Sequence, residues 1–169
     1  MNRMKFIRSM AAGSLGLAVP SAMLQSQNNP KPASLPVEKV KEFVGVCHSD
    51  LDKVKALQAE FPNLVFASWD WGGGDFESGI EAAGHVGRKD IVAFLLEKGS
   101  RTNIFLLTML GQTAWMKSYL ELYPSHLYMK GPHGFSLLHH ANKGGEEAGE
   151  LAAYLQQLGL KETRFNLYS

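Results

Sequence analysis

Six histidines and one cysteine are the residues of this 169-residue chain best suited to acid–base or metal chemistry. A pair of metal-binding histidines on one helix face needs a spacing of three or four residues, as in H-E-x-x-H, and no such pair occurs. His139 and His140 are adjacent, so their side chains should point to different faces of a helix. The sequence also shows no Ser-His-Asp or Cys-His order that would indicate an activated nucleophile. Spacing along the chain therefore identifies no catalytic or metal site by itself.

The composition is that of an ordinary globular protein, with 45% hydrophobic and 20% charged residues. The formal net charge is +1, whereas nucleic-acid-binding proteins carry basic patches or stripes. Lysines between residues 39 and 55 alternate with acidic residues, which is typical of a solvated helix surface. We therefore expect no nucleic-acid partner.

Residues 1–26 have the pattern of a signal peptide, with a basic start, an apolar run at 10–19 and small residues after it. The run is too short to span a membrane, so we expect no transmembrane segment in the mature chain. The start also resembles a twin-arginine export motif, although Met4 stands where the second arginine belongs. We expect export to the periplasm or cell envelope, with residues 27–36, which contain three prolines, as a linker.

A helix–turn–helix pattern at residues 78–103 organises the rest of the chain. Ser78 and Glu81 have the spacing of a capping box at a helix start, and Gly99 stands where a left-handed residue would end the second helix. Each helix has one apolar face, and two such helices cannot bury both faces without neighbouring copies. The apolar positions are Ile80, Ala83, Val86, Ile91, Val92, Leu95 and Leu96.

This segment resembles an ankyrin repeat, whose consensus runs from T-P-L-H through two helices to a final glycine. Glu81 replaces the consensus histidine and Gly79 the consensus proline. The matching positions are Ser78-Gly79-Ile80-Glu81, Ala83-Gly84, Gly87-Arg88, Ile91-Val92, Leu95-Leu96 and Gly99-Ser100. The resemblance implies an all-α ankyrin-repeat solenoid of about four helix pairs over residues 37–160, with short β-hairpin fingers and a C-terminal tail at 161–169.

The further helices follow from the same comparison. Apolar spacing predicts a first helix over 37–47, and an apolar segment at 104–110 predicts a helix covered on both sides. Residues 63–76, apolar and then glycine-rich, predict an extended finger with a tight turn. His139 occupies the ankyrin motif position, where the imidazole is structural.

An ankyrin stack binds partners through its fingers and the C-terminal ends of its inner helices. This implies a non-catalytic protein–protein interaction module, which we expect to be monomeric, with no cofactor or metal. Trp69 and Trp71 have an alternative interpretation as caps over the exposed first repeat. The predicted partner-binding residues are Trp69, Trp71, Asp75, Phe76, Glu77, His85, Met109, His133 and Phe135.

A second interpretation is a small-ligand or metal-binding protein, or a hydrolase, that uses the same face. It centres on His85, Asp75 and His133. His48 and Cys47 would supply further nitrogen and sulfur ligands of the kind that zinc accepts. Sequence spacing does not show whether these residues converge, so both interpretations stay open here.

Overall fold

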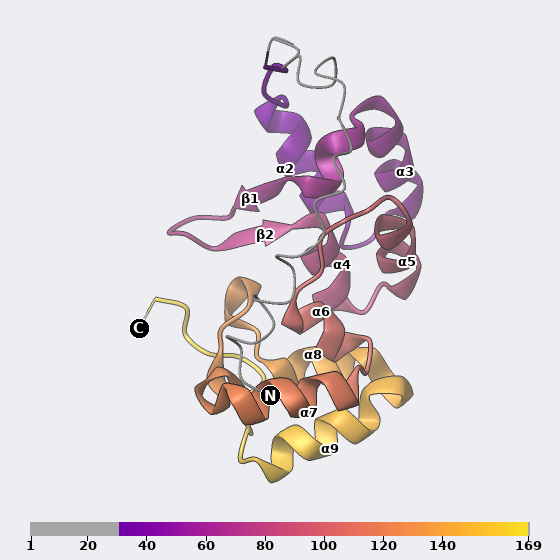
Figure 1. Ribbon diagram of the computed structural model, residues 1–169. Coiled ribbons are helices and arrows are strands. Elements are labelled where there is room, and N and C mark those ends of the chain that lie inside the picture. Colours follow the sequence, from indigo (N-terminus) through magenta and orange to yellow (C-terminus); the bar gives the residue numbers. More distant parts are fainter. Residues whose placement is uncertain (1–30, 169) are drawn as a thin grey trace, which may run out of the picture. The chain divides into compact units, whose positions relative to one another are not determined.

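The computed structural model describes residues 31–168, which are mostly helical with one small sheet (Figure 1). The predicted signal peptide and the start of the linker lie outside the described residues. Residues 34–168 belong to one compact unit. Within the described part of the chain, no helix is long and apolar enough to cross a membrane.

The α-helices come in consecutive pairs joined by short turns. Three-residue strands and short 3-10 segments connect some of the pairs. The helices are α2 (Val37–Val46), α3 (Leu51–Glu60), α4 (Gly79–Val86), α5 (Lys89–Glu97), α6 (Ile104–Met109), α7 (Thr113–Leu122), α8 (Leu137–Gly144) and α9 (Gly149–Gln157). The 3-10 segments are η2 (Pro62–Phe66), η3 (Pro124–Tyr128), η4 (Pro132–Gly134) and η5 (Gly145–Ala148).

The predicted helix pair at residues 78–103 is confirmed as α4 and α5. The Glu81 carboxylate accepts hydrogen bonds from the Ser78 backbone N–H at 2.8 Å and from the Ser78 hydroxyl at 2.6 Å. Gly99 adopts φ 85°, as a left-handed residue after a helix end should. Gly87, at φ 82°, ends α4 in the same way and fixes the short turn into α5.

Four of the helices pack in succession: α2 contacts α4, α4 contacts α6, and α6 contacts α8. Among the remaining helices, α3 packs on α5 and α7 packs on α9. Helix α6 is apolar on both sides, as predicted, because Leu106 belongs to the core shared with α2–α5 and Phe105 to the core shared with α7–α9. Burying one such side chain contributes about 1.5–3 kcal/mol. Stacking therefore supplies the burial that a single pair lacks.

The predicted finger is an antiparallel hairpin of β1 (Ser68–Asp70) and β2 (Phe76–Ser78), with Trp69 opposite Glu77. It projects beside α4 in Figure 1. Glycines 72–74 all have positive φ, and the Asp70 carboxylate accepts from the backbone N–H groups of the first and last of them. Because side chains alternate along a strand, Phe76 is exposed and Glu77 is buried.

The finger starts later than its apolar sequence predicts. Residues 62–66 form the 3-10 segment η2 instead of a strand, with Pro62 at its first position, where a missing N–H is tolerated. Leu64 and Val65 are buried in the first core, so their apolar character reflects packing and not strand pairing. Strand β1 begins at Ser68.

The C-terminal segment, predicted as a tail, pairs with the turn before α8. Ser136 N–H donates to the Thr163 carbonyl at 3.1 Å, and Phe165 N–H donates to the Gly134 carbonyl at 2.8 Å. Farther along, the Tyr168 hydroxyl donates to the Gly72 carbonyl of the hairpin at 2.8 Å. The end of the chain therefore links the turn at 131–134 to the finger.

Candidate metal centre

Four side chains from four separate segments converge beside the hairpin. One ligand atom from each residue, an imidazole nitrogen or a carboxylate oxygen, lies within 4.8 Å of the other three. The residues are His48 in the turn after α2, Glu77 on β2, His85 in the last turn of α4, and His133 in η4. Imidazole and carboxylate groups are the ligands that zinc and related divalent ions accept in proteins.

The distances between these groups are close to those of a coordination shell. His48 Nε2 lies 3.0 Å from His85 Nε2, and His85 Nε2 lies 2.8 Å from Glu77 Oε1. Glu77 Oε1 is 3.4 Å from His133 Nε2, and Glu77 Oε2 is 3.5 Å from His48 Nε2. Ligands bound at 2.0–2.1 Å to a tetrahedral Zn²⁺ lie about 3.3 Å apart. Small shifts would seat such an ion.

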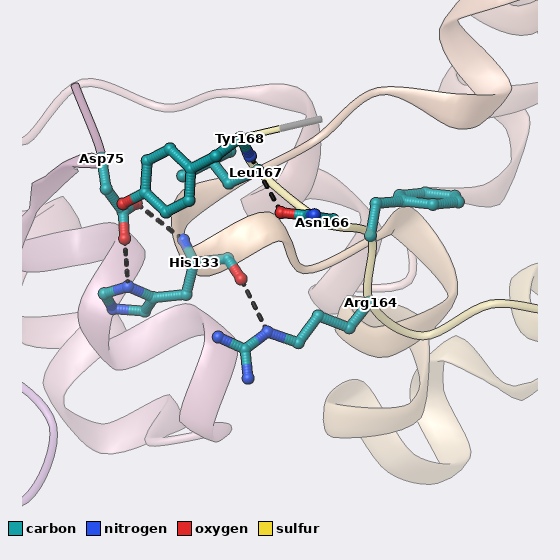
Figure 2. Close-up of a pocket in the computed structure, with 7 residues that line it drawn as sticks. Asp75, His133, Arg164, Asn166, Leu167 and Tyr168 are labelled. Carbon is teal, nitrogen blue, oxygen red and sulfur yellow. Dashed lines mark hydrogen bonds and ion pairs between the residues drawn. The ribbon is translucent and has the colours of Figure 1, made fainter. Parts of the chain in front are cut away.

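The outer ring nitrogens of two of the histidines have acceptors that fix their tautomers. His48 Nδ1 lies 3.0 Å from the Gly45 carbonyl, which can only accept. His133 Nδ1 lies 2.7 Å from Asp75 Oδ2 (Figure 2). Protons on these Nδ1 atoms leave the Nε2 lone pairs facing the centre. Metal-binding histidines are commonly oriented in this way by a carbonyl or a carboxylate.

Glu77 is fully buried, and its two oxygens have different surroundings. Trp71 Nε1–H donates to Oε2 at 2.8 Å, whereas Oε1 makes no hydrogen bond within the described residues. Burial alone would raise the pKa of this carboxyl, but the close approach of His85, the Trp71 N–H and the charge of His48 hold the pKa below its ordinary value. The centre thus contains a buried carboxylate whose Oε1 makes no hydrogen bond within the described residues but lies 2.8 Å from His85 Nε2.

His133 has a backbone conformation that residues other than glycine rarely adopt. It is the one non-glycine residue with positive φ in the described chain, at φ 58° and ψ 15°. The Asp75 carboxylate accepts from both its backbone N–H, at 2.8 Å, and its Nδ1. Such conformations persist where surrounding contacts determine them, and they gather at functional sites. Here the contacts aim the imidazole at Glu77.

His85 is positioned by α8 and by the segment before it. Phe135 stacks against the His85 ring with centroids 5.0 Å apart, and His139 Nε2 donates to the His85 carbonyl at 2.8 Å. Burial lowers the pKa of His139, in keeping with a neutral ring in that role. The bond between α8 and α4 agrees with the structural role predicted for His139.

The other thiol and imidazole groups lie outside the centre. Cys47, proposed as a zinc ligand, is completely buried beside Phe43 and Gly79, and burial raises the pKa of its thiol well above the ordinary range. His140 donates to the Ser136 carbonyl, and His126, on η3, forms a hydrogen bond with Tyr119 on α7. Asp75, also proposed as a ligand, forms a hydrogen bond with His133 Nδ1, on the side of the ring that faces away from the centre.

The predicted partner-binding residues divide by burial. Asp75, Glu77 and His85 are buried in the centre just described, and Met109 is buried in the core. Trp69 is half-buried against the first core, with the Lys41 ammonium 5.5 Å from its ring centroid, as its alternative role of cap would require. Trp71 and Phe76 are exposed on the finger. Phe135 is half-buried between His85 and His139.

Sequence reasoning identified three of the four members of the centre but not as one group. It grouped His85 with His133, and His48 with His85, and it placed Glu77 on the interaction surface. The signal for Glu77 is its position next to exposed Phe76 on a strand, which turns it inward. No spacing rule links four residues contributed by a turn, a strand, a helix and a second turn.

No family model, no curated protein and no solved structure matches this chain. The functional argument therefore depends on the geometry of the centre.

Proposed function

We propose that this chain is a metal-binding protein that holds one divalent transition-metal ion, preferentially Zn²⁺, between His48, Glu77, His85 and His133. The observation that carries the proposal is the convergence of three imidazole Nε2 atoms on a buried carboxylate. A metal ion would bind Glu77 Oε1, which makes no hydrogen bond within the described residues although His85 Nε2 lies 2.8 Å from it. It would also separate the two imidazole nitrogens that face each other at 3.0 Å.

The ligand set favours zinc over the harder divalent ions. Mg²⁺ and Ca²⁺ prefer shells made of oxygen atoms, whereas three neutral imidazoles with one carboxylate suit Zn²⁺. Burial also favours the bound ion, because a lone carboxylate in the interior is costly unless it is paired. With Zn²⁺ bound, the four ligands and the ion carry a net charge of +1.

An ankyrin-type stack is the scaffold that we propose for this centre. The successive contacts of α2, α4, α6 and α8 support it, as do the outer contacts of α3 with α5 and of α7 with α9. The finger between α3 and α4 supplies Glu77, and the inner helix end supplies His85. We further propose that the chain is monomeric. We also propose that it is exported to the periplasm or cell envelope, because of the signal-peptide pattern at residues 1–26.

A shared proton is the competing explanation of the same cluster. A positively charged His85 would neutralise Glu77 without any metal. The two explanations differ in a zinc titration of the metal-free protein, measured by competition with a chromophoric chelator. A metal centre predicts saturable binding of one Zn²⁺ per chain, and a proton-sharing cluster predicts none.

Matched variants locate the binding. Glu77→Gln preserves side-chain size and removes the charge, and we expect it to weaken zinc binding by more than the ten- to hundredfold typical of changes to residues that hold a metal-binding histidine in place. His126→Asn alters a histidine outside the centre and should leave the affinity unchanged. Equal zinc affinities for wild type and Glu77→Gln would refute the proposed site. Circular dichroism would verify that each variant is folded.

Protein binding by the finger is a second candidate function. Phe76 is 61% exposed and Trp71 39% exposed, and both lie on the hairpin. Exposed aromatic residues supply contact area in interfaces at a small entropic cost. We propose that the finger binds an envelope protein, and the test is a pull-down with the Phe76→Ala variant described below.

A further inference from the structure

A cavity of about 420 Å³ lies next to the proposed metal centre (Figure 2). Its size falls within the range of small-ligand pockets. Two of its walls, Asp75 and His133, belong to the centre or support it, and the remaining walls come from the C-terminal segment. The lining residues are Asp75, His133, Arg164, Phe165, Asn166, Leu167 and Tyr168.

Arg164 is the cationic side chain of this cavity. Its Nε–H donates to the His133 carbonyl at 2.8 Å, and its guanidinium carbon lies 5.2 Å from the centroid of the Phe135 ring. No ion pair joins Arg164 to an acidic residue within residues 31–168. The neighbouring carboxylate of Asp75 is engaged, because each of its oxygens already accepts a hydrogen bond from His133.

The position of Arg164 is held by two backbone contacts of the C-terminal segment. Residue 164 forms a β-bridge with Phe135, and the next residue, Phe165, donates to the Gly134 carbonyl. Phe135 in turn stacks on His85. A guanidinium held in this way offers a planar fork of N–H donors, which matches the oxygens of carboxylate and phosphate groups.

We propose that the cavity binds a small ligand that carries a carboxylate or phosphate group, with Arg164 as its anchor. The proposal rests on the proposed metal centre for the second positive charge, since the ion and its four ligands carry +1. Arg164 contributes another +1 and Asp75 contributes −1. The cavity beside a loaded centre is therefore electropositive, and a small anion would be attracted to it.

Inorganic phosphate and acetate are suitable probes for calorimetric titration. The zinc-loaded protein, freed of excess metal, is titrated with each probe in a non-coordinating buffer. We expect at least one of the two anions to bind saturably to the wild type. The anion that binds more tightly assigns the ligand class.

Three arginine variants identify the anchor. Arg164→Gln should weaken anion binding by about tenfold or more, and any loss of zinc affinity should be smaller, since Arg164 contacts only the backbone carbonyl of His133. Arg164→Lys keeps the charge without the fork and should retain part of the affinity. Arg101→Gln is the matched control, since Arg101 is also stacked on a phenylalanine, with its guanidinium carbon 5.3 Å from the Phe66 ring centroid, but outside this cavity.

The possible results separate this inference from the metal centre itself. Saturable zinc binding without any anion binding up to tens of millimolar would overturn the anion site and leave the metal proposal intact. Equal anion affinities in wild type and Arg164→Gln would also overturn it. Phosphate binding that depends on Arg164 in a chain that takes up no zinc would support the cavity and refute the metal centre.

Discussion

Asp75 binds His133 twice, through the backbone N–H at 2.8 Å and through Nδ1 at 2.7 Å. One carboxylate thereby fixes both a left-handed backbone and the direction of an imidazole. Asp75 precedes strand β2 and His133 lies in the turn before α8, so this pair of bonds also joins the finger to the last helix pair. The proposed metal centre depends on these two hydrogen bonds.

Replacing Asp75 with Asn tests the hydrogen bonds between Asp75 and His133. The amide has one acceptor oxygen instead of two, so it cannot accept from both donors of His133 as the carboxylate does. We expect zinc binding to weaken by about ten- to a hundredfold, as is typical when a partner behind a metal-binding histidine is changed. Chelator competition measures this, with Asp90→Asn on the surface of α5 as the control. An unchanged affinity would show that Asp75 does not orient a ligand.

Two glycine variants test the contact between the C-terminal segment and the His133 turn. Gly134 and Gly99 both have positive φ, but a Cβ at Gly134 would lie 2.2 Å from the Phe165 carbonyl oxygen, whereas at Gly99 it would meet nothing within 4 Å. Gly99→Ala should cost about 1 kcal/mol of unfolding free energy from backbone strain alone. Gly134→Ala should cost more and should also weaken zinc binding.

Denaturant unfolding and the zinc titration together measure this difference. A Gly134→Ala variant no less stable than Gly99→Ala would mean that the segment moves aside freely. An unchanged zinc affinity in Gly134→Ala would mean that the segment does not help to hold His133.

The indole N–H of Trp71 is the donor to the buried carboxylate, at 2.8 Å from Glu77 Oε2. Trp71→Phe removes this donor and keeps an aromatic ring, so we expect zinc binding to weaken by about tenfold or more. Trp115→Phe changes an exposed indole on α7 and should have no effect. Equal affinities in the two variants would show that Trp71 is not part of the centre's support.

Phe76 separates partner binding from metal binding. Its exposed ring lies on the finger opposite Asp70, on the other side of the strand from the buried Glu77. Phe76→Ala should therefore abolish capture of an envelope protein while zinc affinity stays unchanged. The Trp71 and Phe76 double variant should lose both. Retained capture in Phe76→Ala would place any partner site elsewhere.

The buried histidine of α8, His140, should contribute to the pH dependence of the free energy of unfolding. Burial lowers the pKa of His140 to about 4, below the ordinary value of 6.5. The unfolded chain binds a proton there between these two pH values and the folded chain does not, so stability is full above pH 6.5 and is lost as the pH falls toward 4. In metal-free protein this residue should account for about 2 kcal/mol of the loss between pH 7 and pH 5.

His140→Asn is the variant that measures this share. Its amide can still donate to the Ser136 carbonyl, as His140 Nδ1 does, but it does not titrate. Denaturant unfolding at both pH values should give a smaller loss for the variant than for the wild type. Equal losses would contradict a buried neutral His140 in the folded state.

Local patterns in the sequence predicted most of the fold. The capping box at Ser78 and the left-handed Gly99 set the ends of one helix pair, and both signals act within a few residues. Residues 62–66 misled the prediction, because a buried 3-10 segment and a strand share the same apolar composition. That ambiguity is resolved by packing, which a single sequence does not display.

The candidate site was less predictable for a related reason. His48 and His133 approach the same carboxylate only because three helix pairs bring their turns to one side of the hairpin. That approach depends on tertiary packing, and no sequence spacing encodes it. Arg164 was assigned to a tail, since nothing in the residues 161–169 indicates that they pair with the turn before α8.

X-ray absorption of the zinc-loaded protein tests the central claim most directly. It reports the kind and number of donor atoms around the ion and the multiple scattering typical of imidazole rings, and elemental analysis of the same sample gives the number of ions per chain. We predict one zinc per chain, bound at about 2.0–2.1 Å by nitrogen and oxygen donors that include three imidazoles, without sulfur. A chain that retains no stoichiometric zinc, or a spectrum with a sulfur ligand or with fewer than three imidazoles, would contradict the centre formed by His48, Glu77, His85 and His133.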